Sequence, residues 1–179
     1  MLLFRQHKVA ILTPPRCGTV SIHKCMPVEL NEGEQYPHHI ELKDVKPEIG
    51  PDFLTLCPVR NPWTRVYSYF CYVQEHPEHH YHNQFKDLSF TKYVLEDHHR
   101  IAPCSQWAKD CKVRIEFVDW FKTVDLILTQ LGIPHSYPQK LNGTTRSGSS
   151  LLDYTPDAVD KIRDYYHKDL EYFKFLPPM

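Results

Sequence analysis

The first residues that could do chemistry lie in Pro14–Ser21, where the sequence reads PPRCGTVS. An apolar run over residues 8–13 precedes them and predicts a buried strand, and a helix is expected to follow as far as Met26. Gly18 permits a tight turn between the two elements, so that several backbone N–H groups point at one place. The helix dipole adds positive potential there and Arg16 adds a full charge. This pattern predicts a site for a phosphate or sulfate group, although the triphosphate-binding pattern G-x-x-x-x-G-K-[ST] is absent.

A second group of polar residues lies in Val59–Ser68, where the sequence reads VRNPWTRVYS. Arg60 is expected at the end of a strand, and Ser68 two turns into the helix that follows. At this spacing a guanidinium and a hydroxyl group can hold one further phosphate. Arg65 is interpreted as a helix-surface cation in a salt bridge. The aromatic residues of this stretch are interpreted as core side chains: Trp63 and Tyr67.

Together these motifs resemble one family, the sulfotransferases that use 3′-phosphoadenosine 5′-phosphosulfate (PAPS). PPRCGTVS is similar to that family's 5′-phosphosulfate loop, and VRNPWTRVYSYF is similar to its 3′-phosphate motif. The segment His38–Val45 and the C-terminal stretch Tyr166–Phe173 resemble the carbohydrate-type branch. The loop usually carries a lysine where this chain has Arg16, and an arginine there resembles the tyrosylprotein branch. The resemblance runs from about residue 8 to residue 175, essentially the whole chain.

The resemblance implies a role for each residue of the two motifs. Arg16 becomes a catalytic cation at the bridging oxygen of the phosphosulfate. Arg60 and Ser68 become ligands of the 3′-phosphate, the group that distinguishes PAPS and its product PAP from ATP, and Arg146 is placed beside them. The residues expected to bind the phosphosulfate are Arg16, Cys17, Gly18, Thr19, Val20 and Ser21. No metal ion is expected, because arginine and N–H groups meet the charge of the leaving group.

The acceptor hydroxyl needs a base, and an imidazole that titrates near neutrality suits that task. His39 is the predicted base because it belongs to the segment between the two phosphate motifs that resembles the family's histidine-containing segment. The adjacent His38 is the alternative histidine, and Glu41 is the alternative carboxylate. The expected acceptor is a hydroxyl group on a sugar, ahead of a peptide or a small metabolite.

Other interpretations of the sequence remain open. A nucleotide phosphotransferase would share the phosphate-loop architecture but needs a triphosphate-loop lysine and a Mg²⁺ carboxylate, and neither is evident. A non-catalytic PAP-binding protein would keep Arg60 and Ser68 but would need no base. Trp107 is a candidate for the lining of an acceptor or adenine pocket. Four histidines in a polar segment are interpreted as solvated rather than as metal ligands: His76, His79, His80 and His82.

The elements that must position these residues alternate between strands and helices. Apolar runs at residues 8–13 and 53–59, and a period-two alternation over residues 113–118, predict strands. Between and after them, helices are expected from Thr19 or Ser21, from Pro62, from Ser89, over 121–131 and from Pro156 through residue 173. Strands separated by helices indicate an α/β fold with a parallel sheet flanked by helices. We therefore expect a single sulfotransferase domain over residues 1–179, with the architecture of the P-loop nucleotide kinases that the resemblance implies.

Composition excludes several classes of protein. The chain of 179 residues is 41% hydrophobic and 24% charged, which is typical of a globular protein. Its formal net charge of -1 gives no general basic field, so nucleic acid is not an expected partner. No apolar run approaches the roughly 18 residues of a membrane span. The oligomeric state is not predicted.

The cysteines and the first residues of the chain concern its cellular compartment. The six cysteines form no CxxC pair or zinc-knuckle spacing, so we expect reduced and mostly buried thiols. The N-terminal residues MLLFRQHK contain neither an apolar signal region nor a cleavage site, which predicts a cytoplasmic protein.

Overall fold

The computed structural model describes residues 1–27, 38–45, 49–139 and 153–177. The chain divides into two compact units, each described here by itself. Unit 1 comprises Met1–Arg60 and Cys104–Asn142, and unit 2 comprises Asn61–Pro103 and Gly143–Met179. The single sulfotransferase domain expected from the sequence stays a prediction.

Unit 1 contains a sheet in which, for the part of the chain that is described, four strands lie in the order β1-β2-β3-β4. The strands are β1 (Leu2–Phe4), β2 (Val9–Ile11), β3 (Leu54–Val59) and β4 (Val113–Glu116). Strands β2, β3 and β4 are parallel, and β1 pairs antiparallel with β2. The predicted α/β class with a mainly parallel sheet is confirmed, as are the three predicted strands. β1 was not predicted, because three apolar residues with no Gly or Asn turn after them give no hairpin signal.

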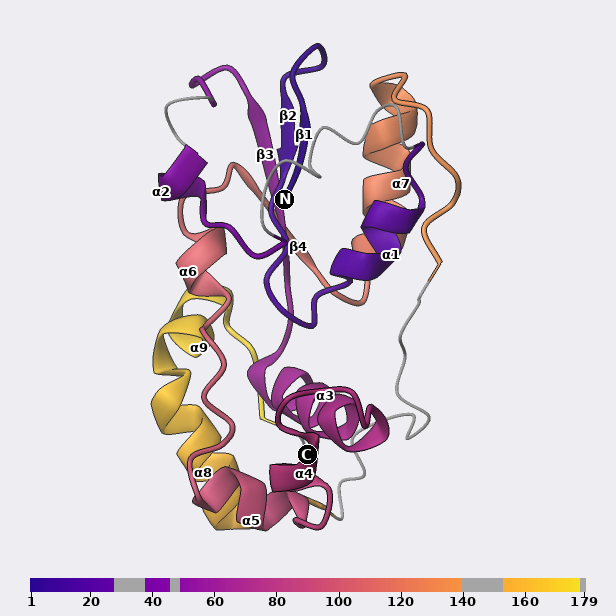
Figure 1. Cartoon of the computed structure of the whole chain (residues 1–179). Coiled ribbons are helices and arrows are strands. Elements are labelled where there is room, and N and C mark those ends of the chain that lie inside the picture. The colour runs from indigo at the N-terminus through magenta and orange to yellow at the C-terminus, as the bar shows by residue number, and fades with distance from the viewer. Residues whose placement is uncertain (28–37, 46–48, 140–152, 178–179) are drawn as a thin grey trace. The chain divides into compact units, whose positions relative to one another are not determined.

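Helices cover both faces of this sheet. Figure 1 shows α1 (Thr19–Lys24) and α7 (Trp120–Gln130) on one face, and α2 (Leu42–Val45) and α6 (Ser105–Ala108) on the other. On the first face the buried side chains of α1 and α7 pack on those of the strands, with Ile22 and Trp120 fully buried among them. Burial of apolar surface from three layers accounts for most of the stability expected of such a unit.

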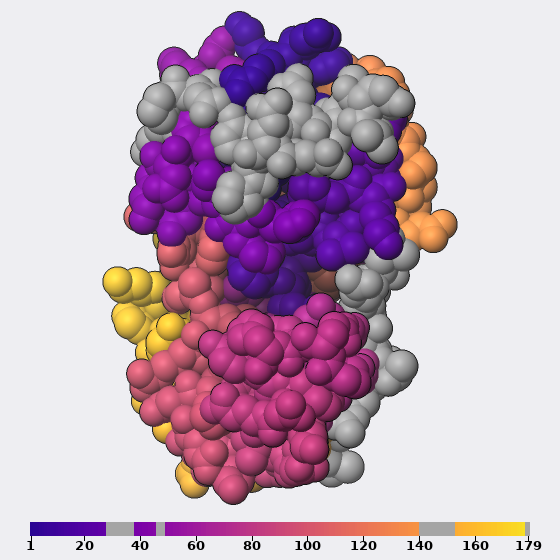
Figure 2. All heavy atoms as spheres, in the orientation of Figure 1, coloured from indigo at the N-terminus to yellow at the C-terminus, as the bar shows by residue number. Residues whose placement is uncertain are grey.

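Unit 2 is built from helices, and its core is aromatic. The helices are α3 (Pro62–Glu75), α4 (His82–Phe85), α5 (Phe90–Leu95), α8 (Pro156–Tyr165) and α9 (His167–Phe173). Trp63, Phe70, Tyr93 and Tyr166 are buried where α3, α5 and α8 pack together. In the space-filling view, the segment from α3 to α5, in magenta and pink, covers the face of unit 2 turned to the viewer (Figure 2).

Three sequence predictions about these helices need correction. Arg65 is fully buried and is not a surface cation. The expected C-terminal helix is divided at Tyr166, where the backbone leaves the helical region. Helix α1 begins after Gly18 with no side-chain cap, so neither Thr19 nor Ser21 caps it. The start of α3 at Pro62 and the Ser89 cap of α5 are as predicted.

Two further observations bear on the class of protein. All six cysteines are buried thiols outside any disulfide, which confirms the expectation from the sequence. Within the described ranges, no helix combines the length and the apolar character that a membrane crossing requires.

Candidate active site

The loop that joins β2 to α1 has an unusual backbone. Arg16 and Gly18 both have positive φ, at 63° and 84°. The N–H group of Cys17, between them, donates to the carbonyl oxygen of Pro14 over 3.2 Å. For Arg16, a residue with a side chain, this conformation costs about 1–2 kcal/mol. Such local strain is concentrated at functional sites, where the surrounding structure holds it in place.

Glycine is required at position 18 by the lack of space for a Cβ atom as well as by the positive φ. A Cβ atom at this position would lie 3.2 Å from Cδ1 of Trp120 and 3.3 Å from the ring of Phe121. Both rings belong to α7, and Trp120 is fully buried. Helix α7 therefore supports the underside of the loop and fixes its path.

We expect replacement of Gly18 by alanine to lower the free energy of unfolding by about 2–3 kcal/mol, measured by urea denaturation. The positive φ accounts for roughly 1–2 kcal/mol, and the crowding against α7 adds to it. Gly132→Ala is the matched control, because Gly132 has a φ of 66° and nothing within 4 Å of its Cβ position. Equal losses in the two variants would show that contact with α7 does not matter.

Arg60, the residue of the second motif that belongs to unit 1, contacts the loop of the first motif. It follows the last residue of β3, and its Nη1 donates to the carbonyl oxygen of Arg16 over 3.0 Å. Its guanidinium also lies over the ring of Phe117, 4.6 Å from the centroid. The carboxyl ends of the parallel strands β2 and β3 meet at one edge of the sheet, which explains how residues 44 positions apart come into contact.

The residues around Gly18 differ in how exposed their side chains are, because helix α1 begins there. Thr19 is buried, and its Oγ1 has no hydrogen-bond partner among the residues that the structure describes. Cys17 and Ser21 are buried as well, whereas Val20 is exposed. A buried hydroxyl without a partner is costly unless a ligand or water satisfies it.

His39 lies beside the start of the same loop. Its Nδ1 is 2.8 Å from the carbonyl oxygen of Thr13, which can only accept, so Nδ1 carries the proton and Nε2 has the lone pair. The indole Nε1 of Trp107 donates to the backbone oxygen of His39 over 3.1 Å. Trp107 is buried, so it anchors this turn rather than lining an open pocket. The tautomer is the one in which Nε2 can accept a proton.

His38 has different neighbours, one of which the sequence analysis missed. The rings of His38 and His23 meet edge to face, with centroids 4.8 Å apart. Burial, followed by nearby cationic groups that include His38 and His39, lowers the pKa of His23 to about 4. His23 is therefore neutral at neutral pH. The sequence feature that could have identified His23 as a neighbour of this site is its position four residues after Thr19, on the same face of α1.

Glu41, the alternative base, is engaged by other side chains. It accepts from the amide of Gln106 and lies 3.0 Å from the ammonium of Lys43. Burial alone would raise the pKa of Glu41, but these two partners lower it. A carboxylate with a lowered pKa is a weaker base, so the geometry favours the histidines over Glu41.

Two predicted ligands of the 3′-phosphate are not brought to this site by unit 1. Ser68 is a buried residue of α3 and belongs to unit 2, so its pairing with Arg60 stays a prediction. Arg146 lies outside the described residues. The residues that unit 1 does bring together are Arg16, Gly18, Thr19, His39 and Arg60.

The histidine-rich segment of unit 2 is partly packed, with His80 exposed and the other three histidines half-buried. The Nδ1 atoms of His76 and His82 donate to the carbonyl oxygens of Tyr72 and Val73. The ring of His79 stacks on that of His80, with centroids 4.5 Å apart. The solvated state predicted for all four side chains therefore holds for His80, whereas His76, His79 and His82 are partly packed. Within the described ranges, no three or more His, Cys, Asp or Glu side chains are arranged to hold a metal ion.

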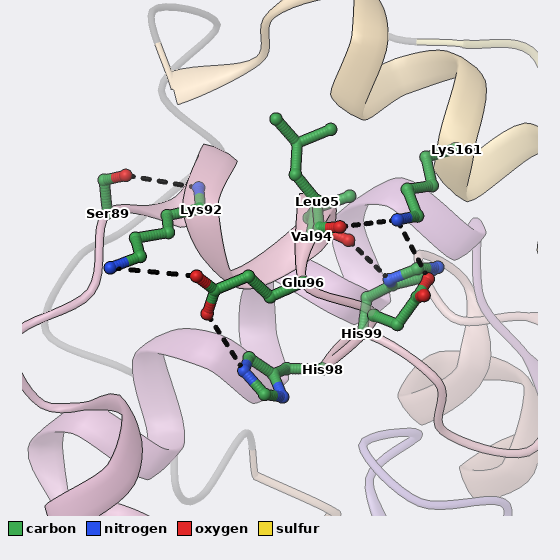
Figure 3. Close-up of polar contacts among 9 residues, drawn as sticks. Ser89, Lys92, Val94, Leu95, Glu96, His98, His99 and Lys161 are labelled. Carbon is green, nitrogen blue, oxygen red and sulfur yellow. Dashed lines mark hydrogen bonds and ion pairs between the residues drawn. The ribbon is translucent and has the colours of Figure 1, made fainter.

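A surface pocket of about 340 Å³ lies in unit 2, between the end of α5 and α8. Figure 3 shows its polar contacts: Lys161 donates to the carbonyl oxygen of Leu95, and Nδ1 of His99 donates to that of Val94 over 3.1 Å. Lys161 also lies 3.1 Å from Asp97, which pairs with Arg100. Asp164 also lines the pocket, so two carboxylates balance two cations and the lining offers no net charge to a ligand.

Comparisons with known proteins find similarity among solved structures. No family model matches the chain. No curated protein matches it in sequence. Among solved structures, the chain is similar to the crystal structure of mouse sulfotransferase SULT7A1 complexed with PAP, with 16% sequence identity and a TM-score of 0.48. The similarity covers 90% of this chain and 84% of the mouse chain.

Proposed function

We propose that this protein is a sulfotransferase that moves the sulfuryl group of PAPS to an acceptor hydroxyl. The observation that carries the proposal is the hydrogen bond from Arg60 to the carbonyl oxygen of Arg16. It joins the two motifs that resemble the phosphosulfate loop and the 3′-phosphate motif, at the same edge of the sheet as His39. A base and two arginines beside one loop are the groups that sulfuryl transfer requires.

The residues of the loop fit a phosphosulfate. The hydroxyl of Thr19 is buried without a partner among the described residues, and a sulfate or phosphate oxygen would satisfy it. Positive φ at Arg16 and Gly18 is the backbone pattern of anion-binding turns, and of the N–H groups in it that of Cys17 is used by Pro14. Arg16 supplies the charge that meets the bridging oxygen, in the place where related loops carry lysine.

The remaining roles follow the same chemistry. Arg60, with Ser68 and Arg146, would hold the 3′-phosphate. His39 takes the proton of the acceptor hydroxyl on Nε2, because Nδ1 is already committed to Thr13. PAPS supplies the activated sulfuryl group, and the product is PAP. A cytoplasmic location belongs to this proposal, as does the P-loop-like architecture.

The proposed acceptor is a sugar hydroxyl, since His38–Val45 and Tyr166–Phe173 resemble the carbohydrate-type branch. The test is transfer of labelled sulfate from PAPS to sugar, peptide and small-metabolite acceptors. Sulfation of a sugar supports the proposal, and sulfation of another class alone corrects the acceptor. Tight binding of PAP without turnover on any acceptor would favour a non-catalytic PAP-binding protein.

We expect EDTA to leave the rate of sulfuryl transfer unchanged. Arg16, Arg60 and the loop N–H groups meet the developing charge, so no divalent cation is needed. The measurement compares rates in EDTA and in added Mg²⁺. A strict requirement for Mg²⁺ would favour the nucleotide phosphotransferase interpretation, in which a metal bridges phosphate oxygens.

A further inference from the structure

Four of the buried cysteines gather in unit 1 next to the candidate loop. The Sγ atoms of Cys17 and Cys104 are 3.8 Å apart, and both side chains are fully buried. Burial raises the pKa of Cys57 well above its usual range, and Cys111, Cys104 and Cys17, in that order, raise it further. These thiols come from distant parts of the sequence and meet between the sheet and α6. The sequence contains no CxxC spacing that would predict such a cluster.

We propose that Cys17 and Cys104 form a disulfide under oxidising conditions, which ties the β2–α1 loop to the start of α6. Their sulfur atoms are at van der Waals contact, and a disulfide needs them about 2.05 Å apart. Cys104 precedes the short helix α6, and Cys17 lies in a loop between two residues of positive φ. Neither residue lies in a strand, so drawing their sulfur atoms together breaks no strand pairing of the sheet.

Cys57 is less suited to move. It lies within β3, where its backbone is paired with Arg114 of β4, and β3 pairs with β2 on its other side. A shift of Cys57 would break hydrogen bonds between the strands. Buried backbone groups left without partners cost stability. The geometry therefore favours the Cys17–Cys104 bond over a bond between Cys57 and Cys111.

The chemistry requires an external oxidant, for which we name a small disulfide such as glutathione disulfide. One cysteine thiolate attacks a sulfur of glutathione disulfide, whose S–S bond breaks and releases one glutathione thiolate. The second cysteine thiolate attacks the resulting mixed disulfide and releases the second glutathione. Two protein thiols are oxidised, one disulfide is reduced, and the two protons pass to the two glutathione thiolates. Because both thiols are buried, local opening of the loop must come first.

The bond would change the loop that the proposed function uses, and this consequence rests on that function. Drawing Cys17 toward Cys104 moves its neighbours Arg16 and Gly18, and with them the carbonyl oxygen that Arg60 holds. The N–H groups of the loop then lose their arrangement around the anion. Oxidation is expected to weaken PAP binding, and by linkage bound PAP is expected to shift the equilibrium away from the disulfide.

The experiment compares the full chain in dithiothreitol with the same chain after glutathione disulfide. Trypsin cuts after Arg16, Lys24, Arg100 and Lys109, so the disulfide joins peptide 17–24 to peptide 101–109. A bond between Cys57 and Cys111 would instead join peptides 44–60 and 110–112. We expect the first pair of peptides by mass spectrometry, and at least about fivefold weaker PAP binding by calorimetry, restored by dithiothreitol.

Cys104→Ser tests whether the disulfide causes the loss of PAP affinity, because Cys104 lies outside the loop. This variant is expected to bind PAP like the reduced chain under both conditions. Cys111→Ser, a buried cysteine a few residues away, is the matched control and is expected to keep the redox response.

Each contrary outcome has a distinct meaning. A different peptide pair, or a Cys104→Ser variant that still loses PAP binding on oxidation, overturns the assignment of the disulfide. Unchanged PAP affinity in the oxidised chain with the expected peptide pair overturns the effect on the loop. A reduced chain that does not bind PAP overturns the proposed function instead, while the mapped disulfide stands on its own.

Discussion

Replacing Arg60 by alanine is expected to weaken PAP binding roughly 10- to 100-fold, by about 1.5–3 kcal/mol. The guanidinium is positioned at the end of β3 by its bond to the Arg16 carbonyl and by the ring of Phe117. An arginine held in this way is pre-organised for a phosphate, which strengthens the contact. Calorimetric titration of the variant with PAP, and with AMP as a second ligand, measures the loss.

The two nucleotides separate two consequences of the substitution. AMP has a 5′-phosphate but no 3′-phosphate, so its loss of affinity reports how far the loop depends on the bond to Arg16. The additional loss for PAP reports the contact with the 3′-phosphate. We expect the loss for PAP to be at least fivefold larger. Equal losses for PAP and AMP would remove Arg60 from the 3′-phosphate and leave it as a support for the loop.

Arg114→Ala is the matched control for Arg60→Ala. Arg114 also belongs to unit 1 and also donates to backbone carbonyls, those of Ala108 and Lys109, at 2.8 and 3.0 Å. Its removal should therefore cost similar local stability without touching the loop. We expect PAP affinity in this variant to stay within about twofold of the unsubstituted chain. A comparable loss would mean that general destabilisation explains the Arg60 result.

The parts of the fold that the sequence predicted are those set by local signals. Apolar runs that end at Pro predicted β2 and β3, the period-two alternation of residues 113–118 predicted β4, and the turn around Gly18 predicted the loop before α1. Asn61 caps α3 by accepting from the N–H of Trp63, which fits the Pro62 signal. The contact between Arg60 and Arg16 was not predicted as such. It follows from a parallel sheet, which brings the ends of successive strands to one edge.

The features that the sequence did not predict depend on contacts between distant residues. Arg65 has the spacing of a surface cation on α3, but it is buried in unit 2, where α3 packs against α8, and no local pattern encodes that contact. His23 and His38 meet although 15 positions separate them, and Cys17 and Cys104 meet across 87. Such contacts depend on the tertiary fold, so composition and periodicity do not predict them.

Replacing His39 by alanine is expected to lower kcat by about 10²–10⁴ and to leave PAP binding unchanged, because general base catalysis contributes this much. The bond from Nδ1 to Thr13 fixes the tautomer, and the bond from Trp107 fixes the backbone of the same residue. A residue held at its ring by one bond and at its backbone by the other needs little reorganisation to meet the acceptor hydroxyl. The measurement is steady-state turnover with PAPS and the acceptor found by screening.

His38→Ala is the control, since His38 is adjacent, equally exposed and packed on His23 instead of Thr13. We expect its kcat to stay within about fivefold of the unsubstituted chain. The pH profile gives an independent check: the rate should rise with pH as His39 loses its second proton, and this rise should be absent in His39→Ala. If His38→Ala loses turnover and the pH limb while His39→Ala keeps both, the base is His38, and the bond to Thr13 only stabilises the turn.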